Sequence, residues 1–127
     1  MLTQILPEIS IRQNQIVKDY LFQLDVHIND LRIGKAEKTF EIKDLAELLH
    51  IHPTHLSNTI SHALGQSPCD LYEQRLVALS KELLLNTTLP IKAIALQLFY
   101  DPSNFTKFFK HFEGTTPKQF RLSRLRN

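Results

Sequence analysis

The sequence is poor in the features that mark secreted, membrane and disulfide-bonded proteins. Its 127 residues include one cysteine, Cys69, so no internal disulfide can form and a reducing compartment is indicated. No apolar run reaches the roughly 18 residues of a membrane-spanning helix. The first ten residues lack the basic and then apolar order of a secretory signal. We therefore expect a cytoplasmic protein with no membrane partner.

Motifs for chemistry are absent as well. There is no glycine-rich phosphate loop and no nucleophile elbow, and the acidic residues are scattered over polar positions. Four of the six histidines share one segment, but they lack the HxxxH and HExxH spacings and a neighbouring cysteine ligand. These four are His50, His52, His55 and His62. The sequence thus predicts no enzyme, no cofactor and no metal site.

The net charge is only +2, but it is unevenly distributed. Residues 1–101 carry nine Lys/Arg against twelve Asp/Glu, whereas residues 102–127 carry six Lys/Arg against one Glu. A basic face at the C-terminal end could therefore meet phosphate groups. A solvated basic tail explains the charge equally well, so the charge alone does not distinguish it from a phosphate-binding face.

Apolar residues recur at helical spacing, and no stretch alternates as a strand does. After a lead of about eight residues, we expect a helix from about Ser10 to Ile33, ended by Gly34. Ser67-Pro68 predicts the start of a second long helix, because serine caps and proline suits the first position. The candidate core positions are Val17, Tyr20, Leu21, Leu24, Ile28 and Leu31 in the first helix, and Leu71, Leu76, Leu79, Leu83 and Leu84 in the second.

The stretch from Ile91 to Arg121 predicts two short helices and the start of a third. Asp101 is a good N-cap and Pro102 suits the first helical position, so a helix should begin there. An apolar stripe at helical spacing follows on that helix, formed by Phe105, Phe109 and Phe112.

The chain contains an internal repeat of 49 residues without a gap. Ile42 falls on Ile91, Pro53 on Pro102, and Gly65 on Gly114. Apolar contacts, helix starts and helix ends all coincide in this way, which indicates one supersecondary unit used twice. The unit is a helix, a short turn and a second helix, that is, a helix-turn-helix. The helix between the copies spans about 27 Å, of the order of the roughly 34 Å between major grooves on one face of B-DNA.

The stretch from Phe40 to Arg121 resembles the DNA-binding domain of AraC-type (AraC/XylS) transcription regulators. The resemblance is carried by IKDLAELLHIHPTHLSNTISHALG in the first half and by IKAIALQLFYDPSNFTKFFKHFEGTTPKQFR in the second. It implies an all-α fold of about seven helices, with two tandem helix-turn-helix subdomains joined by a long central helix. We expect an N-terminal lead and amphipathic helix over 1–35 and the DNA-binding domain over 36–127. Within that domain the elements are a first helix-turn-helix over about 42–65, a connecting helix over 68–86, a second helix-turn-helix over 91–114 and a C-terminal helix over 117–125.

The sequence departs from the family pattern in two places. The family usually carries a glycine before the Phe99-Tyr100 position and one more residue in that turn, so the second turn here has the length of the first. The first recognition helix also contains no Lys or Arg. These departures keep one alternative open, a helical protein-interaction module that has lost DNA binding.

The resemblance implies a sequence-specific transcription regulator that places two recognition helices in successive major grooves of double-stranded DNA. The predicted base contacts are Thr54, Ser57, Asn58, Ser103, Asn104, Thr106 and Lys107. The predicted phosphate contacts are Lys43, Lys92, Lys110, Lys118 and Arg121. RNA polymerase is the protein partner that the family implies. Residues 1–35 are too short for a sensor domain, so we expect either a small stand-alone member or the C-terminal piece of a longer chain.

Overall fold

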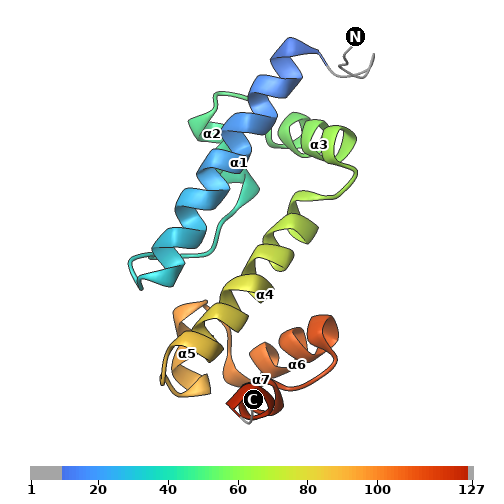
Figure 1. The fold of residues 1–127 in the computed structure, drawn as a ribbon. Coiled ribbons are helices and arrows are strands. Elements are labelled where there is room, and N and C mark those ends of the chain that lie inside the picture. The colour runs from blue at the N-terminus through green and yellow to red at the C-terminus, as the bar shows by residue number, and fades with distance from the viewer. Residues whose placement is uncertain (1–9, 126–127) are drawn as a thin grey trace. The chain divides into compact units, whose positions relative to one another are not determined.

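The computed structural model describes residues 10–125, and these form seven α-helices and no strand (Figure 1). The predicted all-α fold is confirmed. The predicted lead over residues 1–8 lies outside the described residues. The helices are α1 (Ile11–Arg32), α2 (Ile42–Leu48), α3 (Pro53–Leu64), α4 (Pro68–Asn86), α5 (Ile91–Gln97), α6 (Pro102–Glu113) and α7 (Pro117–Leu125).

The described residues divide into two compact units. The first unit comprises residues 10–27 and 40–72, and the second comprises residues 28–39 and 73–125. Both long helices, α1 and α4, contribute residues to both units. Residues 10–35, which the sequence analysis set apart, are therefore shared between the units, and each unit holds one helix-turn-helix.

The first unit encloses α2 and α3 against the N-terminal part of α1. Leu56 and Ile60, at i and i+4 on α3, are completely buried, as is Ala46 on α2. Helix α1 contributes the fully buried Leu24, and Ile16 (2% exposed), which the predicted apolar face omitted. Leu21 and Leu71 were predicted as core but are only half-buried, because each lies at the edge of its helix's apolar stripe.

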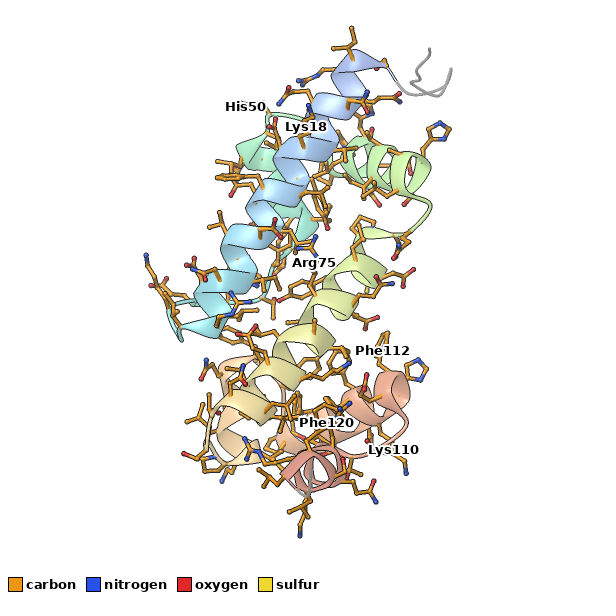
Figure 2. All side chains as sticks on the ribbon, viewed as in Figure 1. Lys18, His50, Arg75, Lys110, Phe112 and Phe120 are labelled. Atoms are coloured by element: carbon orange, nitrogen blue, oxygen red, sulfur yellow. The ribbon has the colours of Figure 1, made fainter. Side chains whose placement is uncertain are left out.

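The second unit is built around aromatic residues of α6 and α7. Phe105 and Phe109 are fully buried, and the Phe109 ring meets Phe120 edge-on, with 5.5 Å between ring centroids. Phe120 and Phe112 are labelled in Figure 2. The prediction that Phe112 continues this stripe is wrong, since it is 40% exposed. Phe108 is half-buried in its place, stacked on Tyr100 at 4.8 Å between ring centroids. The i, i+3, i+4 spacing alone does not determine whether Phe108 or Phe112 lies on the more buried side of the stripe.

The C-terminal end of α1 is fastened within the second unit. The Gln97 side-chain amide donates to the carbonyls of Leu31 and Arg32, which have no partner inside the helix. The Arg32 guanidinium forms a two-point ion pair with Glu82 of α4, with N–O distances of 2.6 and 3.3 Å. Gly34 ends α1 at φ +74°, as predicted.

The two helix-turn-helix turns have the same backbone geometry. His50 and Phe99, which coincide in the repeat, both adopt the left-handed conformation, at φ 60° and 66°. The residue after each donates its amide to a carbonyl five residues back: Ile51 to Ala46 and Tyr100 to Ala95, both at 2.9 Å. The predicted equality of turn length is confirmed. In each turn, a residue with a β-carbon thus adopts the left-handed conformation that glycine adopts at the lowest steric cost.

We predict that His50→Gly stabilises the protein by roughly 0.5–1 kcal/mol. The left-handed conformation costs a residue with a β-carbon about 1–2 kcal/mol, and glycine's extra backbone entropy cancels part of the gain. His50 is exposed, so little packing is lost. Urea unfolding of the two proteins would measure the difference.

Gly65→Ala is the matched control for this prediction. Gly65 has φ +69°, and no atom lies within 4 Å of the position of an added β-carbon. Its expected destabilisation of about 1 kcal/mol therefore comes from backbone strain alone. A loss of stability in His50→Gly would show that the turn does not carry this strain.

Candidate nucleic-acid interface

Helix α3 is held by caps at both ends and presents a polar outer face. The His52 Nδ1 atom accepts from the Thr54 amide at 3.1 Å, Pro53 occupies the first position, and Gly65 ends the helix. Because Leu56 and Ile60 face inward, the exposed Thr54 and Asn58 lie on the opposite face. Two predicted base-contact residues therefore share the outer face of α3.

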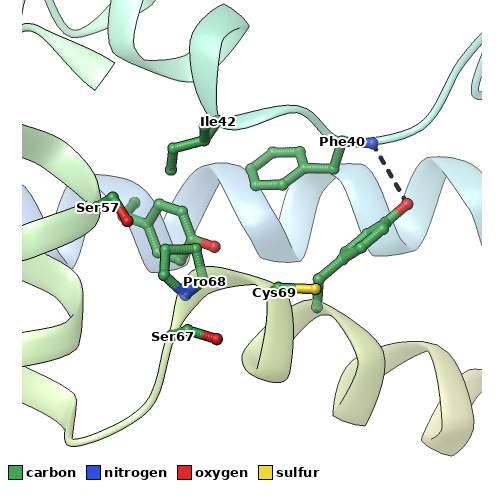
Figure 3. Close-up of a pocket in the computed structure, with 8 residues that line it drawn as sticks. Phe40, Ile42, Ser57, Ser67, Pro68 and Cys69 are labelled. Atoms are coloured by element: carbon green, nitrogen blue, oxygen red, sulfur yellow. Dashed lines mark hydrogen bonds between the residues drawn. The ribbon is translucent and has the colours of Figure 1, made fainter. Parts of the chain in front are cut away.

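Ser57 has a different position from the one predicted. It is half-buried and lines a hollow inside the first unit together with Tyr20 and Phe40 (Figure 3). At about 100° per residue, it lies between the buried and the outer faces of α3. It is therefore a weaker candidate for base contact than Thr54 or Asn58.

Helix α6 repeats this arrangement with a stronger cap. The Asp101 carboxylate accepts from the amides of Ser103 and Asn104, and from the Ser103 hydroxyl at 2.6 Å. Ser103, Asn104 and Lys107 are exposed. Thr106 coincides with Ser57 in the repeat and is likewise half-buried, and its hydroxyl donates to the Pro102 carbonyl at 3.2 Å. Thr106, like Ser57, is therefore a weaker base-contact candidate.

The cap lowers the pKa of the Asp101 carboxyl below its ordinary value. The main cause is the hydrogen bond from the Ser103 hydroxyl, followed by the amide of Asn104, with a smaller contribution from the charge of Lys107. The charged carboxylate is therefore the form that holds the N-terminus of α6, where anions are favoured.

Most of the exposed cations among residues 10–125 lie on the second unit. Lys92 on α5, Lys107 and Lys110 on α6, and Lys118 on α7 are all exposed, and the Lys110 side chain extends away from α6 in Figure 2. In the first unit, by contrast, α3 holds no Lys or Arg, and the exposed Lys43 lies 3.5 Å from the Glu41 carboxylate. The charge asymmetry in the sequence is thus an asymmetry between the two helix-turn-helix motifs.

Arg121 points inward, and the phosphate role predicted for it gives way to a structural one. Its guanidinium donates to the carbonyls of Leu84, Leu89 and Thr87, at 2.9, 2.7 and 3.3 Å. These carbonyls belong to the end of α4 and to the turn that follows it. A residue on α7 thus satisfies backbone acceptors that the helix end leaves without partners.

Sequence reasoning missed the outward position of His111 on α6. His111 is exposed and coincides with the exposed His62 of α3 in the repeat. Each lies four residues after an outer-face position, Lys107 and Asn58 respectively, on the same side of its helix. The repeat alignment contained this signal, because the two histidines are identical at matched positions.

Across residues 10–125, no group of three or more His, Cys, Asp or Glu side chains is placed to hold a metal ion. In the same range, every helix is too short or too polar to span a bilayer.

Comparison with known proteins identifies the family. Residues 45–123 match the family described as a helix-turn-helix domain. The chain belongs to the AraC-type helix-turn-helix family. This is a family of DNA-binding regulators and not of enzymes.

The relatives are transcription regulators about three times as long as the matched region. The chain is 35% identical over 86 residues to the uncharacterized helix-turn-helix-type regulator YisR of Bacillus subtilis (strain 168), covering 67% of this chain and 30% of that protein. It is 30% identical over 87 residues to the arabinose operon regulatory protein of Escherichia coli (strain K12), covering 68% and 30%. The chain thus spans about a third of the length of these curated relatives.

Solved structures share the fold. The C-terminal domain of the response regulator AraT from Geobacillus stearothermophilus superposes with a TM-score of 0.75 at 30% identity, covering 92% of this chain and 88% of that one. The DNA-binding domain of AdpA, solved in complex with a target DNA, has a TM-score of 0.71 at 16% identity, covering 88% and 95%. The all-helical fold with two helix-turn-helix motifs is therefore that of AraC-type DNA-binding domains.

We predict that Arg121→Gln destabilises the second unit by roughly 2 kcal/mol, since hydrogen bonds from a charged donor are lost and buried carbonyls are left unpaired. The salt dependence of DNA binding should not change. The exposed neighbour Lys118 is the control: Lys118→Gln should alter stability by less than about 0.5 kcal/mol and reduce the salt slope by about one. Urea unfolding and binding at several salt concentrations measure both effects. A reduced salt slope with unchanged stability in Arg121→Gln would restore the phosphate role.

We predict that Asp101→Asn removes one component of acid unfolding. Because the folded-state pKa of Asp101 lies below the ordinary 3.8, the ionised cap contributes stability above that pH. The contribution is lost as the pH falls through the lower folded-state pKa. Asparagine also caps but does not titrate, so the stability difference between the two proteins should shrink below about pH 3.8. Thermal unfolding from pH 7 to pH 2 measures it, and a constant difference would contradict the assignment.

Proposed function

We propose that this chain is the DNA-binding part of a transcription regulator and reads a specific duplex sequence with α3 and α6. The observation that carries the proposal is the matched outer face on both helices. Each presents short polar side chains opposite a fully buried apolar pair, at the positions that reach base edges in helix-turn-helix complexes. Following the family resemblance, we propose that the two helices enter successive major grooves.

We divide the contacts into readers and positioners. Thr54, Asn58, Ser103, Asn104 and Lys107 are the proposed base readers, because Asn can pair with both N6 and N7 of adenine and Lys with O6 and N7 of guanine. Lys43, Lys92, Lys110 and Lys118 are the proposed phosphate contacts, which position the protein without reading sequence. Ser57 and Thr106 remain secondary candidates, and His62 and His111 join the outer faces.

The two helices should contribute differently. The phosphate contacts that we propose in the second unit are exposed lysines on α5, α6 and α7. The second motif should therefore supply most of the electrostatic affinity for DNA. Helix α3 has no cation and should act through hydrogen bonds. Salt should therefore weaken the contribution of α6 more than that of α3.

The partners beyond DNA are part of the proposal. As the family resemblance implies, the regulator would contact RNA polymerase, and it would act in the cytoplasm, where bacterial relatives meet their DNA. A sensor domain on a longer chain is consistent with the greater length of the relatives. An interaction module without DNA binding is disfavoured by four exposed lysines around the second motif.

We predict that affinity for duplex DNA falls steeply with salt, because neutralised phosphates release counterions. Asn58→Ala should cost about 1–3 kcal/mol on the preferred site and little on random duplex. Lys110→Ala should weaken binding to both about equally and reduce the salt slope by about one. Selection of bound duplexes from a random pool supplies the site, and fluorescence anisotropy supplies the affinities.

Two outcomes would contradict the proposal. Absence of binding to any duplex at low salt would reject DNA recognition itself. Equal losses on specific and random DNA for both variants would reject the division into readers and positioners. Glu47→Gln is the matched control, because Glu47 is exposed on α2 and has no proposed contact with bases or phosphates.

A further inference from the structure

The first unit contains a hollow that the DNA-binding role does not use. Its volume is about 330 Å³, at the lower end of the range of small-molecule sites. Figure 3 shows side chains from several segments converging on it: Ser57 from α3, Cys69 from the start of α4, and Phe40 and Ile42 from the segment around the start of α2. Tyr20, Ser67, Pro68 and Tyr72 complete the lining.

The aromatic wall of the hollow is fixed by hydrogen bonds. The Tyr72 hydroxyl accepts from the Phe40 amide at 3.3 Å, the dashed bond in Figure 3. It also lies 2.9 Å from the Nε2 atom of His27. The Phe40 ring packs against Tyr20 and Tyr72, with 5.9 Å between centroids in each pair. Burial raises the pKa of the Tyr72 hydroxyl, which therefore stays neutral. The wall is thus formed without a ligand, as small-molecule sites usually are.

The corresponding positions of the second motif are packed differently. Pro117 and Phe120 are buried in the second unit, whereas their repeat counterparts Pro68 and Leu71 are only half-buried. Arg121, the counterpart of Tyr72, is spread over three backbone carbonyls. The second motif also has a hollow, of about 720 Å³, but its lining includes Arg121 and no residue of α6. A hollow with an uncharged lining that includes a residue of the recognition helix is found in the first motif.

The lining specifies the chemistry of an occupant. Three aromatic rings, a proline and an isoleucine suit a flat apolar body. No Lys, Arg, Asp or Glu is part of the lining, so a charged group would be desolvated without an ion-pair partner. Ser67 Oγ accepts from the Asp70 amide at 3.0 Å, and its hydroxyl hydrogen can turn to donate to a ligand. A hydrogen-bond acceptor on the ligand fits this donor.

We propose that this hollow binds a small neutral aromatic molecule carrying one hydrogen-bond acceptor, and that this ligand regulates DNA binding. The regulatory part rests on the proposed function. Ser57 forms part of the wall and lies on α3 one residue before Asn58 and three after Thr54, both proposed base readers. A ligand that fills the space beneath α3 fixes the position of this helix within the first unit before DNA binds. DNA then binds more tightly, because the protein loses less conformational entropy when DNA binds.

Acetophenone is the probe for the binding step, and benzoate is its anionic counterpart of nearly the same shape. Titration of the isotope-labelled free protein with acetophenone should shift the backbone amide NMR signals of Phe40, Ser57 and Cys69, while residues 73–125 stay unchanged. Benzoate should leave all of them unshifted. Cys69→Phe should weaken acetophenone binding at least about tenfold by filling the space, and Cys69→Ser should retain it. Cys69 lines the hollow and lies outside the buried core, so the larger side chain occupies the hollow without displacing a core residue.

Three results would contradict the binding step. The site is rejected if acetophenone produces no saturable shifts around the hollow. It is equally rejected if Cys69→Phe and Cys69→Ser bind alike while the spectrum of residues 73–125 shows that both are folded. Stronger binding of benzoate than of acetophenone rejects the neutral ligand class.

The regulatory step is measured separately, with the selected duplex. Saturating acetophenone should raise the affinity for this duplex at least about fivefold, and the duplex should raise the affinity for acetophenone by the same factor, as linkage requires. Cys69→Phe should bind the duplex without responding to acetophenone. DNA binding that is indifferent to a bound ligand overturns the regulation and leaves the proposed function intact. Ligand binding without DNA binding overturns the proposed function instead.

Discussion

The one-sided burial of the second helix in each motif is the constraint on which the interface depends. Leu56 and Ile60 in α3, and Phe105 and Phe109 in α6, are all completely buried. A pair at i and i+4 defines one edge of a helix, so its burial also determines which residues face outward. The N-caps and the left-handed turns then determine where the helix begins. The polar outer faces follow from the apolar inner ones.

A second shared device anchors each motif to the segment that precedes it. Tyr72 and Arg121 coincide in the repeat, and each bonds the backbone of a coinciding residue, Phe40 in one case and Leu89 in the other. The tyrosine meets an amide and the arginine a carbonyl, so the position is retained while the polarity of the bond is reversed. The longer arginine also reaches the end of α4. The hollow lined by Tyr72 includes Ser57 of the recognition helix, whereas the lining of the one beside Arg121 has no residue of α6.

The two motifs have diverged in charge and in packing together. The second motif has a dense aromatic interior, an Asp101 cap and exposed lysines, which suits a helix that binds phosphate-rich DNA strongly. The first has an imidazole cap, an uncharged outer face and space beneath the helix.

The sequence by itself determined the helices, their limits and the repeat. Capping residues, prolines and glycines act on their immediate neighbours in the chain, so their effect can be predicted from the sequence alone. Asp101, Pro102 and Gly114 predicted the two ends of α6 in this way. The same holds for the family and for the exposed lysines of α6, since helical periodicity alone separates the Lys107 side from the Phe109 side.

Only the tertiary structure decided the roles of residues at the edges of these patterns. Arg121 lies within the basic C-terminal stretch of the sequence but faces backbone carbonyls, because α7 brings it to the end of α4. Ser57 and Phe112 lie where a helical wheel changes from buried to exposed, and the neighbouring segments determine on which side each falls. The hollow has no signature in the sequence, since it depends on how closely residues distant along the chain fill a shared space.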